Sequence, residues 1–160
     1  VMFIGEGPGY AEDRRAEPFV GRAGQLLDKI LAAISLSRLG TTAADGVYIA
    51  NIVKCHPMKD PSDPEKRGND RPPTLPEMEA CRVYLDEQIR IVRPRFLVAL
   101  GGTAAKALLG TQEGISRLRG RWQEYRSIPL LPTYHPAALL RDPGLKRDVW
   151  NDMKMLRDRL

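Results

Sequence analysis

Three polar side chains lie where buried strands are expected to end, and their chemistry suits the binding of a small polar ligand. Glu6 lies in the turn Gly5-Glu6-Gly7-Pro8-Gly9, directly after four apolar residues, and Asn51 and His135 follow two later apolar runs. Ligands of open parallel α/β sheets bind just outside the carboxyl ends of the strands. We therefore expect these three side chains to meet at one edge of a sheet.

Each side chain also has a purely structural interpretation. The turn around Glu6 lacks the Lys-Ser/Thr ending of a P-loop, so it is either a tight turn or a loop that contacts a ligand. The amide of Asn51 needs partners if it is buried, and these are either the backbone or the amide edge of a ligand. Most single histidines are structural, but His135, between Tyr134 and Pro136 after a predicted parallel strand, is better placed for acid or anion chemistry than an average histidine.

Aromatic and sulfur side chains add two further candidates. Phe19 stands in the segment Pro18-Phe19-Val20-Gly21, where it either covers the core or forms a platform for a base, and such stacking contributes ~1–3 kcal/mol. Cys55 and Cys81 are either reduced thiols or metal ligands, and two cysteines alone do not complete a four-ligand site. The other histidine, His56, has no comparable context.

Composition narrows the class of protein. The 160 residues predict one domain over residues 1–160, and the net charge of +5 favours a polyanionic partner. No apolar run approaches the ~20 residues of a membrane span, and no secretory segment is present, so we expect a cytoplasmic monomer. A strand that begins at Val1 suggests that a segment preceding it is missing.

The elements that would position these residues alternate along the chain. We expect, in order, strands over residues 1–4, 47–53, 96–100 and 128–131 and helices over residues 21–35, 75–92, 103–109 and 148–160. Thr103 would cap its helix, and Val149, Met153, Leu156 and Leu160 would form the buried face of the last one. The pattern predicts a three-layer α/β/α sandwich with a four-stranded, mainly parallel sheet.

A series of motifs then resembles one family over the whole chain. The segments are GEGPG with Glu12-Asp13 after it, PFVGRAGQLL, NIVKCHP, EMEACRVYL, LVALGGTAAKALLG and PTYHPAALLR, in this order. Together they resemble the family 4, iron–sulfur type uracil-DNA glycosylases. That superfamily has a four-stranded parallel sheet between helices, in agreement with the pattern above.

The resemblance implies a role for each candidate in the base pocket. Phe19 would stack on a flipped uracil, and Asn51 would read its pyrimidine edge. His135 would hydrogen-bond the uracil oxygen that gains charge as the glycosidic bond breaks. Glu12 would lie near uracil C5 and exclude the methyl group of thymine.

The resemblance also implies contacts to water, sugar and duplex. Glu6 and the backbone of Gly7 would line the water and sugar side, and Gly7 stands where better-known relatives carry a water-activating Asp. Glu6 and Glu12 remain candidates for a general base, unless the mechanism relies on leaving-group stabilisation. Leu139 or Leu140 would push into the duplex, with Arg141 near a phosphate; all of these positions follow from the resemblance.

The family also binds a 4Fe-4S cluster through four cysteines. Cys55 and Cys81 would be two of these ligands, and the other pair precedes the first strand in the family. Either that segment is not included here or the protein lacks the cluster. The stretch from Met58 to Asp70 is longer than usual and would enlarge the loop beside it.

The predicted function is therefore hydrolysis of the N-glycosidic bond of deoxyuridine in DNA, without lyase activity. One alternative is a relative that binds uracil-DNA covalently or prefers other deaminated bases, but residues 14–17 lack the histidine of the covalent type. The other is a non-catalytic nucleic-acid-binding module. The presence of Phe19, Asn51 and His135 argues against that module.

Overall fold

The centre of the molecule is a five-stranded sheet. The computed structural model describes all of residues 1–160. The strands are β1 (Met2–Gly5), β2 (Tyr48–Asn51), β3 (Leu97–Leu100), β4 (Gln123–Tyr125) and β5 (Ile128–Thr133), in the order β2-β1-β3-β5-β4. The four predicted strands pair in parallel, which confirms the expected sheet. The additional strand, β4, pairs antiparallel with β5 through a tight turn, and its short sequence carries no apolar run that would mark it.

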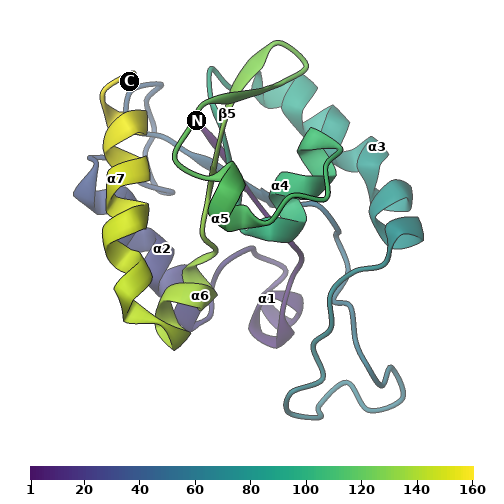
Figure 1. Cartoon of the computed structure of the whole chain (residues 1–160). Coiled ribbons are helices and arrows are strands. Elements are labelled where there is room, and N and C mark those ends of the chain that lie inside the picture. The colour runs from purple at the N-terminus through teal and green to yellow at the C-terminus, as the bar shows by residue number, and fades with distance from the viewer.

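Helices cover both faces of this sheet (Figure 1). They are α1 (Tyr10–Arg15), α2 (Arg22–Ala33), α3 (Leu75–Val92), α4 (Gly102–Leu109), α5 (Ile115–Leu118), α6 (Pro136–Arg141), the 3-10 helix η1 (Pro143–Leu145) and α7 (Lys146–Arg157). Alternate residues of β3 point to opposite faces, so Leu97 and Ala99 pack under α3 and α4 while Val98 and Leu100 pack under α2 and α7. The predicted three-layer sandwich is confirmed. None of its helices is long and apolar enough to cross a membrane.

Two helix boundaries differ from the sequence prediction. Helix α4 begins at Gly102 with Gly101, at φ +92°, as its N-cap, so the prediction that Thr103 caps this helix is wrong. The Thr103 hydroxyl donates to Glu6 instead. Helix α7 ends at Arg157, which leaves Leu160 43% exposed rather than buried, although Val149, Met153 and Leu156 form the buried face as predicted.

The Pro-rich segment 57–74 forms no helix or extended strand and projects from the body of the molecule (Figure 1). Asn69 lies buried inside it and organises the loop, because its amide exchanges hydrogen bonds with the backbone of Asp60. At the outer end, Glu65 accepts a hydrogen bond from the Tyr10 hydroxyl of α1 at 2.5 Å. The loop is therefore fixed beside the carboxyl edge of the sheet.

Candidate active site

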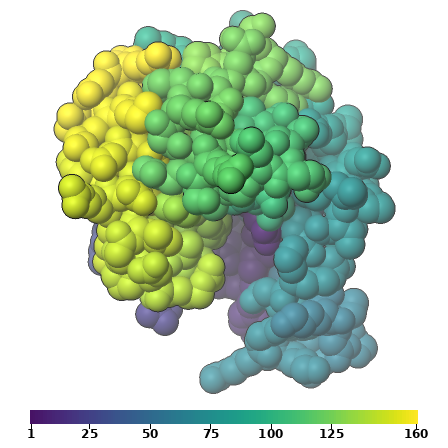
Figure 2. Space-filling view, in the orientation of Figure 1, coloured from purple at the N-terminus to yellow at the C-terminus, as the bar shows by residue number.

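A cavity of about 640 Å³ lies outside the carboxyl ends of β1, β3 and β5. Six of the residues singled out in the sequence line it together: Glu6, Gly7, Glu12, Phe19, His135 and Arg141. Figure 2 shows the hollow between the yellow-green α6 region and the teal loop, with the purple N-terminal segment at its floor. The topology thus brings side chains more than a hundred positions apart to one place, as expected of a parallel sheet.

His135 is a neutral hydrogen-bond donor in this cavity. It is the N-cap of α6, and its Nδ1 accepts a hydrogen bond from the backbone N–H of Ala137 at 3.1 Å. The proton of the neutral ring therefore resides on Nε2. Burial lowers the pKa of His135 to about 4, assisted by the positive charge of Arg141 and opposed by Glu12. At neutral pH the ring offers Nε2–H to an oxygen without carrying a charge.

The turn after β1 supplies one carboxylate to the cavity, that of Glu6, and the space beside Gly7 is too small for a second side chain. The Glu6 Oε2 accepts a hydrogen bond from the Thr103 hydroxyl at 2.5 Å, which fixes the side chain at the cavity wall. A Cβ at Gly7 would lie 2.7 Å from Cγ2 of Val53. A larger residue at position 7 would therefore require the side chain of Val53 or the backbone to move, and the turn as it stands carries no water-activating side chain at that position.

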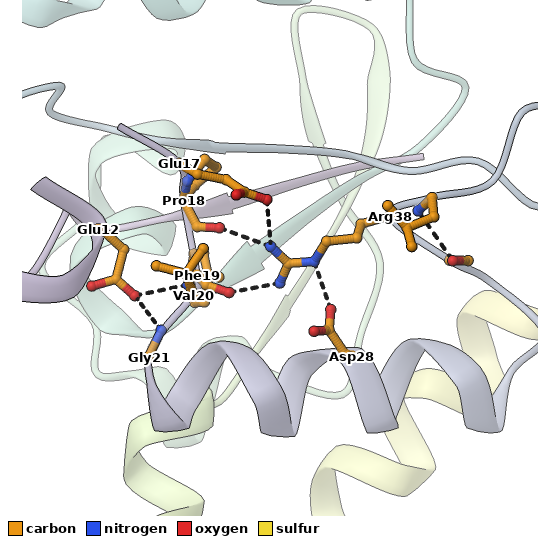
Figure 3. Close-up of polar contacts among 10 residues, drawn as sticks. Glu12, Glu17, Pro18, Phe19, Val20, Gly21, Asp28 and Arg38 are labelled. Atoms are coloured by element: carbon orange, nitrogen blue, oxygen red, sulfur yellow. Dashed lines mark hydrogen bonds and ion pairs between the residues drawn. The ribbon is translucent and has the colours of Figure 1, made fainter. Parts of the chain in front are cut away.

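Glu12 has a structural role in addition to its place in the cavity wall. Its Oε1 accepts hydrogen bonds from the backbone N–H groups of Val20 and Gly21, both at 2.9 Å (Figure 3). Gly21 is the N-cap of α2, where a negative charge is favoured by the helix dipole. Only Oε2 remains for other contacts, so the carboxylate is committed in large part to the loop that carries Phe19.

Phe19 adopts an uncommon backbone conformation, with φ +55°. Its ring is buried and lies 5.3 Å, centroid to centroid, from the ring of His135, with a tilt of 32° between them. The same ring reaches β1, since a Cβ at Gly5 would lie 2.6 Å from its Cζ. Phe19 is therefore both the predicted aromatic of the cavity wall and part of the core.

Asn51 lies beside this cavity rather than in its lining. It is 6% exposed and borders a neighbouring hollow of about 420 Å³, with Pro8 and Glu12 lining both. Its Oδ1 is buried without a hydrogen-bond partner in the chain, so the backbone does not satisfy this atom and the predicted alternative of a ligand partner stays open. An unsatisfied buried acceptor costs about 1–3 kcal/mol. Such an atom suits a ligand N–H group that would complete its bonding.

Two residues at the cavity rim were missed by the sequence reasoning. The ring of His56 is buried, and its Nε2 lies 2.5 Å from Oδ1 of Asp70. Both residues line the cavity. No spacing in the sequence indicates this pair, because the folded loop between them brings them together. Only the position of His56 directly after a strand-end motif could have drawn attention to it.

The two leucines of α6 that were predicted to enter the DNA duplex, Leu139 and Leu140, lie on different faces of the helix. Leu139 is 2% exposed within the core that α2, α6 and α7 share, so it is not the accessible one of the two leucines. Leu140 is 41% exposed. Neighbouring residues on a helix point about 100° apart, so only one of the two faces solvent. Arg141 follows at the exposed end of α6 and lines the cavity.

The two cysteines lie on neighbouring segments and form no disulfide. Sγ of Cys81, in α3, accepts a hydrogen bond from the backbone N–H of Lys54 at 3.4 Å, and the exposed Cys55 follows Lys54 in the chain. No group of three or more histidine, cysteine or acidic side chains is arranged to hold a metal ion. A 4Fe-4S cluster takes four thiolates, so these residues fit half of its ligand set.

Comparison with known proteins agrees with the α/β/α sandwich and its strand-end cavity. The model of the uracil DNA glycosylase superfamily matches residues 1–154. The chain is 41% identical over 163 residues to a type-4 uracil-DNA glycosylase of Pyrobaculum aerophilum, covering 97% of this chain and 75% of that protein. It is 37% identical over 166 residues to the type-4 enzyme of Sulfurisphaera tokodaii, covering 99% of this chain and 69% of that protein. The chain belongs to the uracil DNA glycosylase superfamily and, within it, to the type-4 family.

Proposed function

We propose that this chain is a monofunctional uracil-DNA glycosylase that hydrolyses the N-glycosidic bond of deoxyuridine in DNA. The products are free uracil and an abasic site. The observation that carries the proposal is one cavity that unites Phe19, His135 and Glu6 in a member of the type-4 family. No lysine lines this cavity, so we expect no Schiff-base lyase step.

Leaving-group stabilisation is the main catalytic effect that we propose. When the glycosidic bond breaks, its electron pair moves to uracil N1 and negative charge spreads to the ring oxygens. A fixed Nε2–H donor on neutral His135 would hydrogen-bond the oxygen that gains this charge. A neutral donor suits an anionic leaving group because it stabilises the charge without giving up its proton.

Water attacks the sugar from the side of the turn after β1 in this proposal. Glu6, held by Thr103, is the carboxylate that would orient the water and accept its proton, and its charge would stabilise the cationic character of the sugar. Glu12 is a weaker candidate for this step because two backbone N–H groups occupy its Oε1. The oxygen of the water ends on the sugar carbon and its proton on Glu6, while uracil leaves as the N1 anion; the anion then takes a proton from solvent, and Glu6 returns its proton to solvent.

Base recognition would combine stacking with an amide contact. The base must leave the DNA stack, and a mispaired uracil is easier to extrude than a paired base. The ring of Phe19 would stack on it, and the unpartnered Oδ1 of Asn51 would accept its N3–H. Glu12 would lie near C5 and exclude thymine. Arg141, with its long and charged side chain at the exposed end of α6, would contact a DNA phosphate. The exposed Leu140 would be the residue that enters the duplex.

Cys55 and Cys81 are proposed as two ligands of a 4Fe-4S cluster. The closeness of their segments and the N–H···S hydrogen bond to Cys81 support this proposal. The cluster would hold the loop after β2 against α3, and no catalytic step depends on it. Iron and sulfide analysis of the full-length protein, with and without Cys81→Ser, tests it. Equal iron content in the two proteins would contradict the proposal.

We further propose that residues 1–160 act as one domain, as a monomer, on DNA in the cytoplasm. The family match over residues 1–154 supports a single domain, and the net charge of +5 supports the polyanionic substrate. The direct test of the activity is incubation with an oligonucleotide that carries one uracil, followed by hot alkali. A strand break at the uracil is expected. An intact strand would contradict the enzyme proposal and leave a module that binds DNA without turnover.

A further inference from the structure

Arg38 reaches from outside the cavity to the loop that carries Phe19. The residue lies between α2 and β2, and its side chain is only 17% exposed. Its guanidinium donates to the backbone carbonyl oxygens of Pro18, at 2.9 Å, and Phe19, at 2.7 Å (Figure 3). The Nε–H donates to Asp28 of α2 at 2.6 Å. Arg38 therefore joins the Phe19 loop to the following helix.

Two charged side chains hold this loop, one through its backbone carbonyl groups and the other through its backbone N–H groups. The Arg38 guanidinium takes the carbonyl oxygens, and the Glu12 carboxylate takes the N–H groups of Val20 and Gly21 (Figure 3). Hydrogen bonds to charged groups are the strong ones in proteins. The peptide groups on both sides of Phe19 are thereby fixed in orientation.

The conformation held in this way is one that Phe19 would otherwise rarely adopt. Its φ of +55° lies in the left-handed region, which side-chain-bearing residues seldom populate. The loop also presses against α2, since a Cβ at Gly24 would lie 1.8 Å from the Phe19 oxygen. Side-chain direction follows from backbone dihedrals, so the clamp determines where the Phe19 ring lies relative to His135.

We propose that Arg38 is a positioning residue for base recognition, which acts by holding Phe19 in its left-handed conformation. This inference rests on the proposed function. Arg38 does not line the cavity, so it has no direct contact to make with the base. Without its guanidinium, the carbonyl groups of Pro18 and Phe19 lose their partners and the backbone relaxes toward ordinary φ values. The ring then leaves its place beside His135.

A double-mutant cycle on Arg38→Ala and Phe19→Ala tests this dependence. Each single change should lower the single-turnover rate on uracil-DNA by about 10- to 100-fold, the range that corresponds to stacking of one base on one ring. Inhibition by free uracil should weaken in parallel. The double variant should be no slower than Phe19→Ala alone. Effects that multiply in the double variant, or a wild-type rate for Arg38→Ala, would overturn the proposal.

Control variants separate positioning from general stability. Arg90→Ala removes an arginine that forms an exposed ion pair with Glu87 on α3, and it should leave the rate unchanged. Arg38→Lys keeps the charge but cannot serve both carbonyl groups in a fork, so an intermediate rate is expected. It also replaces Arg38→Ala in the cycle if that variant does not fold.

Amide exchange provides a readout that does not need activity. The N–H groups of Val20 and Gly21 should exchange faster in Arg38→Ala than in the wild type, while those of the β3 strand stay protected. Unchanged exchange at both positions would contradict the clamp. If the wild-type protein itself fails to cleave uracil-DNA, the proposed function fails, and the exchange experiment alone decides whether Arg38 holds the loop.

Discussion

Replacement of His135 by alanine should abolish most of the catalytic rate with little effect on DNA binding. The Nε2–H of His135 is the donor proposed for the oxygen of the leaving uracil, and its direction is fixed by the Nδ1 bond to Ala137. Removal of one such preorganised donor costs about 2.7–4 kcal/mol of transition-state stabilisation, which is a rate loss of about 100- to 1000-fold. The ground-state complex with DNA loses little, because the charge develops only as the bond breaks.

The same substitution also removes the N-cap of α6. Loss of a capping side chain costs about 1 kcal/mol of folding stability, so His135→Ala should unfold at slightly lower denaturant. His135→Asn separates the two effects. Asparagine is a good N-cap but too short to present the same donor, so this variant should retain stability and remain slow.

The appropriate assay is single-turnover cleavage of a uracil-containing duplex with the enzyme in excess. DNA affinity is measured in parallel. The account predicts that both variants bind DNA within a few-fold of the wild type and cleave it far more slowly. If His135→Ala cleaves at the wild-type rate, His135 is not the donor and the reasoning is refuted. If the rate loss is matched by an equal loss of DNA affinity, the donor acts in binding rather than in the transition state.

Four further results are expected. The pKa of His135 is lowered to about 4 in the folded protein, so between about pH 6.5 and pH 4 the unfolded chain takes up a proton that the native chain does not. The free energy of unfolding should therefore fall by up to about 3 kcal/mol as the pH drops over this range. Denaturant titrations should show a smaller fall for His135→Asn. Asn51→Leu removes an unsatisfied buried oxygen, so its Tm should equal or exceed the wild-type value while uracil cleavage drops at least about tenfold; a large fall in Tm would show that the amide is structural. Leu139→Ala should lose about 2–5 kcal/mol of stability in chemical denaturation. Leu140→Ala should keep its stability and slow cleavage of duplex more than of single-stranded uracil-DNA, and equal slowing on both would exclude a wedge role.

Most helices and strands could be predicted from the sequence, because the spacing of apolar residues and the turn residues that flank them are local signals. The buried runs of β1, β2, β3 and β5 and the capped start of α3 at Thr74 are signals contained in a few neighbouring residues. Strand β4 is different, because Gln-Glu-Tyr becomes a strand only by pairing with β5. The role of Thr103 also depended on a distant residue, since its hydroxyl donates to Glu6 across 97 positions instead of capping α4.

The site was predictable in its residue types but not in its supporting contacts. Parallel topology alone brings Glu6 and His135 to one cavity, since both follow strands of the same sheet. The choice between Leu139 and Leu140 needed the packing of α6, because both are leucines in the same turn. The Arg38 contacts to Phe19 join residues with no shared motif, so only the folded chain shows them.

The most direct test of the central claim is whether the protein releases free, unlabelled uracil from DNA and leaves the strand intact. The protein is incubated in H₂¹⁸O with an oligonucleotide that carries one uracil, alongside a matched one that carries thymine, and the products are analysed by mass spectrometry. The account predicts free uracil without the label, an intact strand with one abasic site, and no reaction of the thymine oligonucleotide. Absence of free uracil, or strand cleavage without alkali, would contradict it.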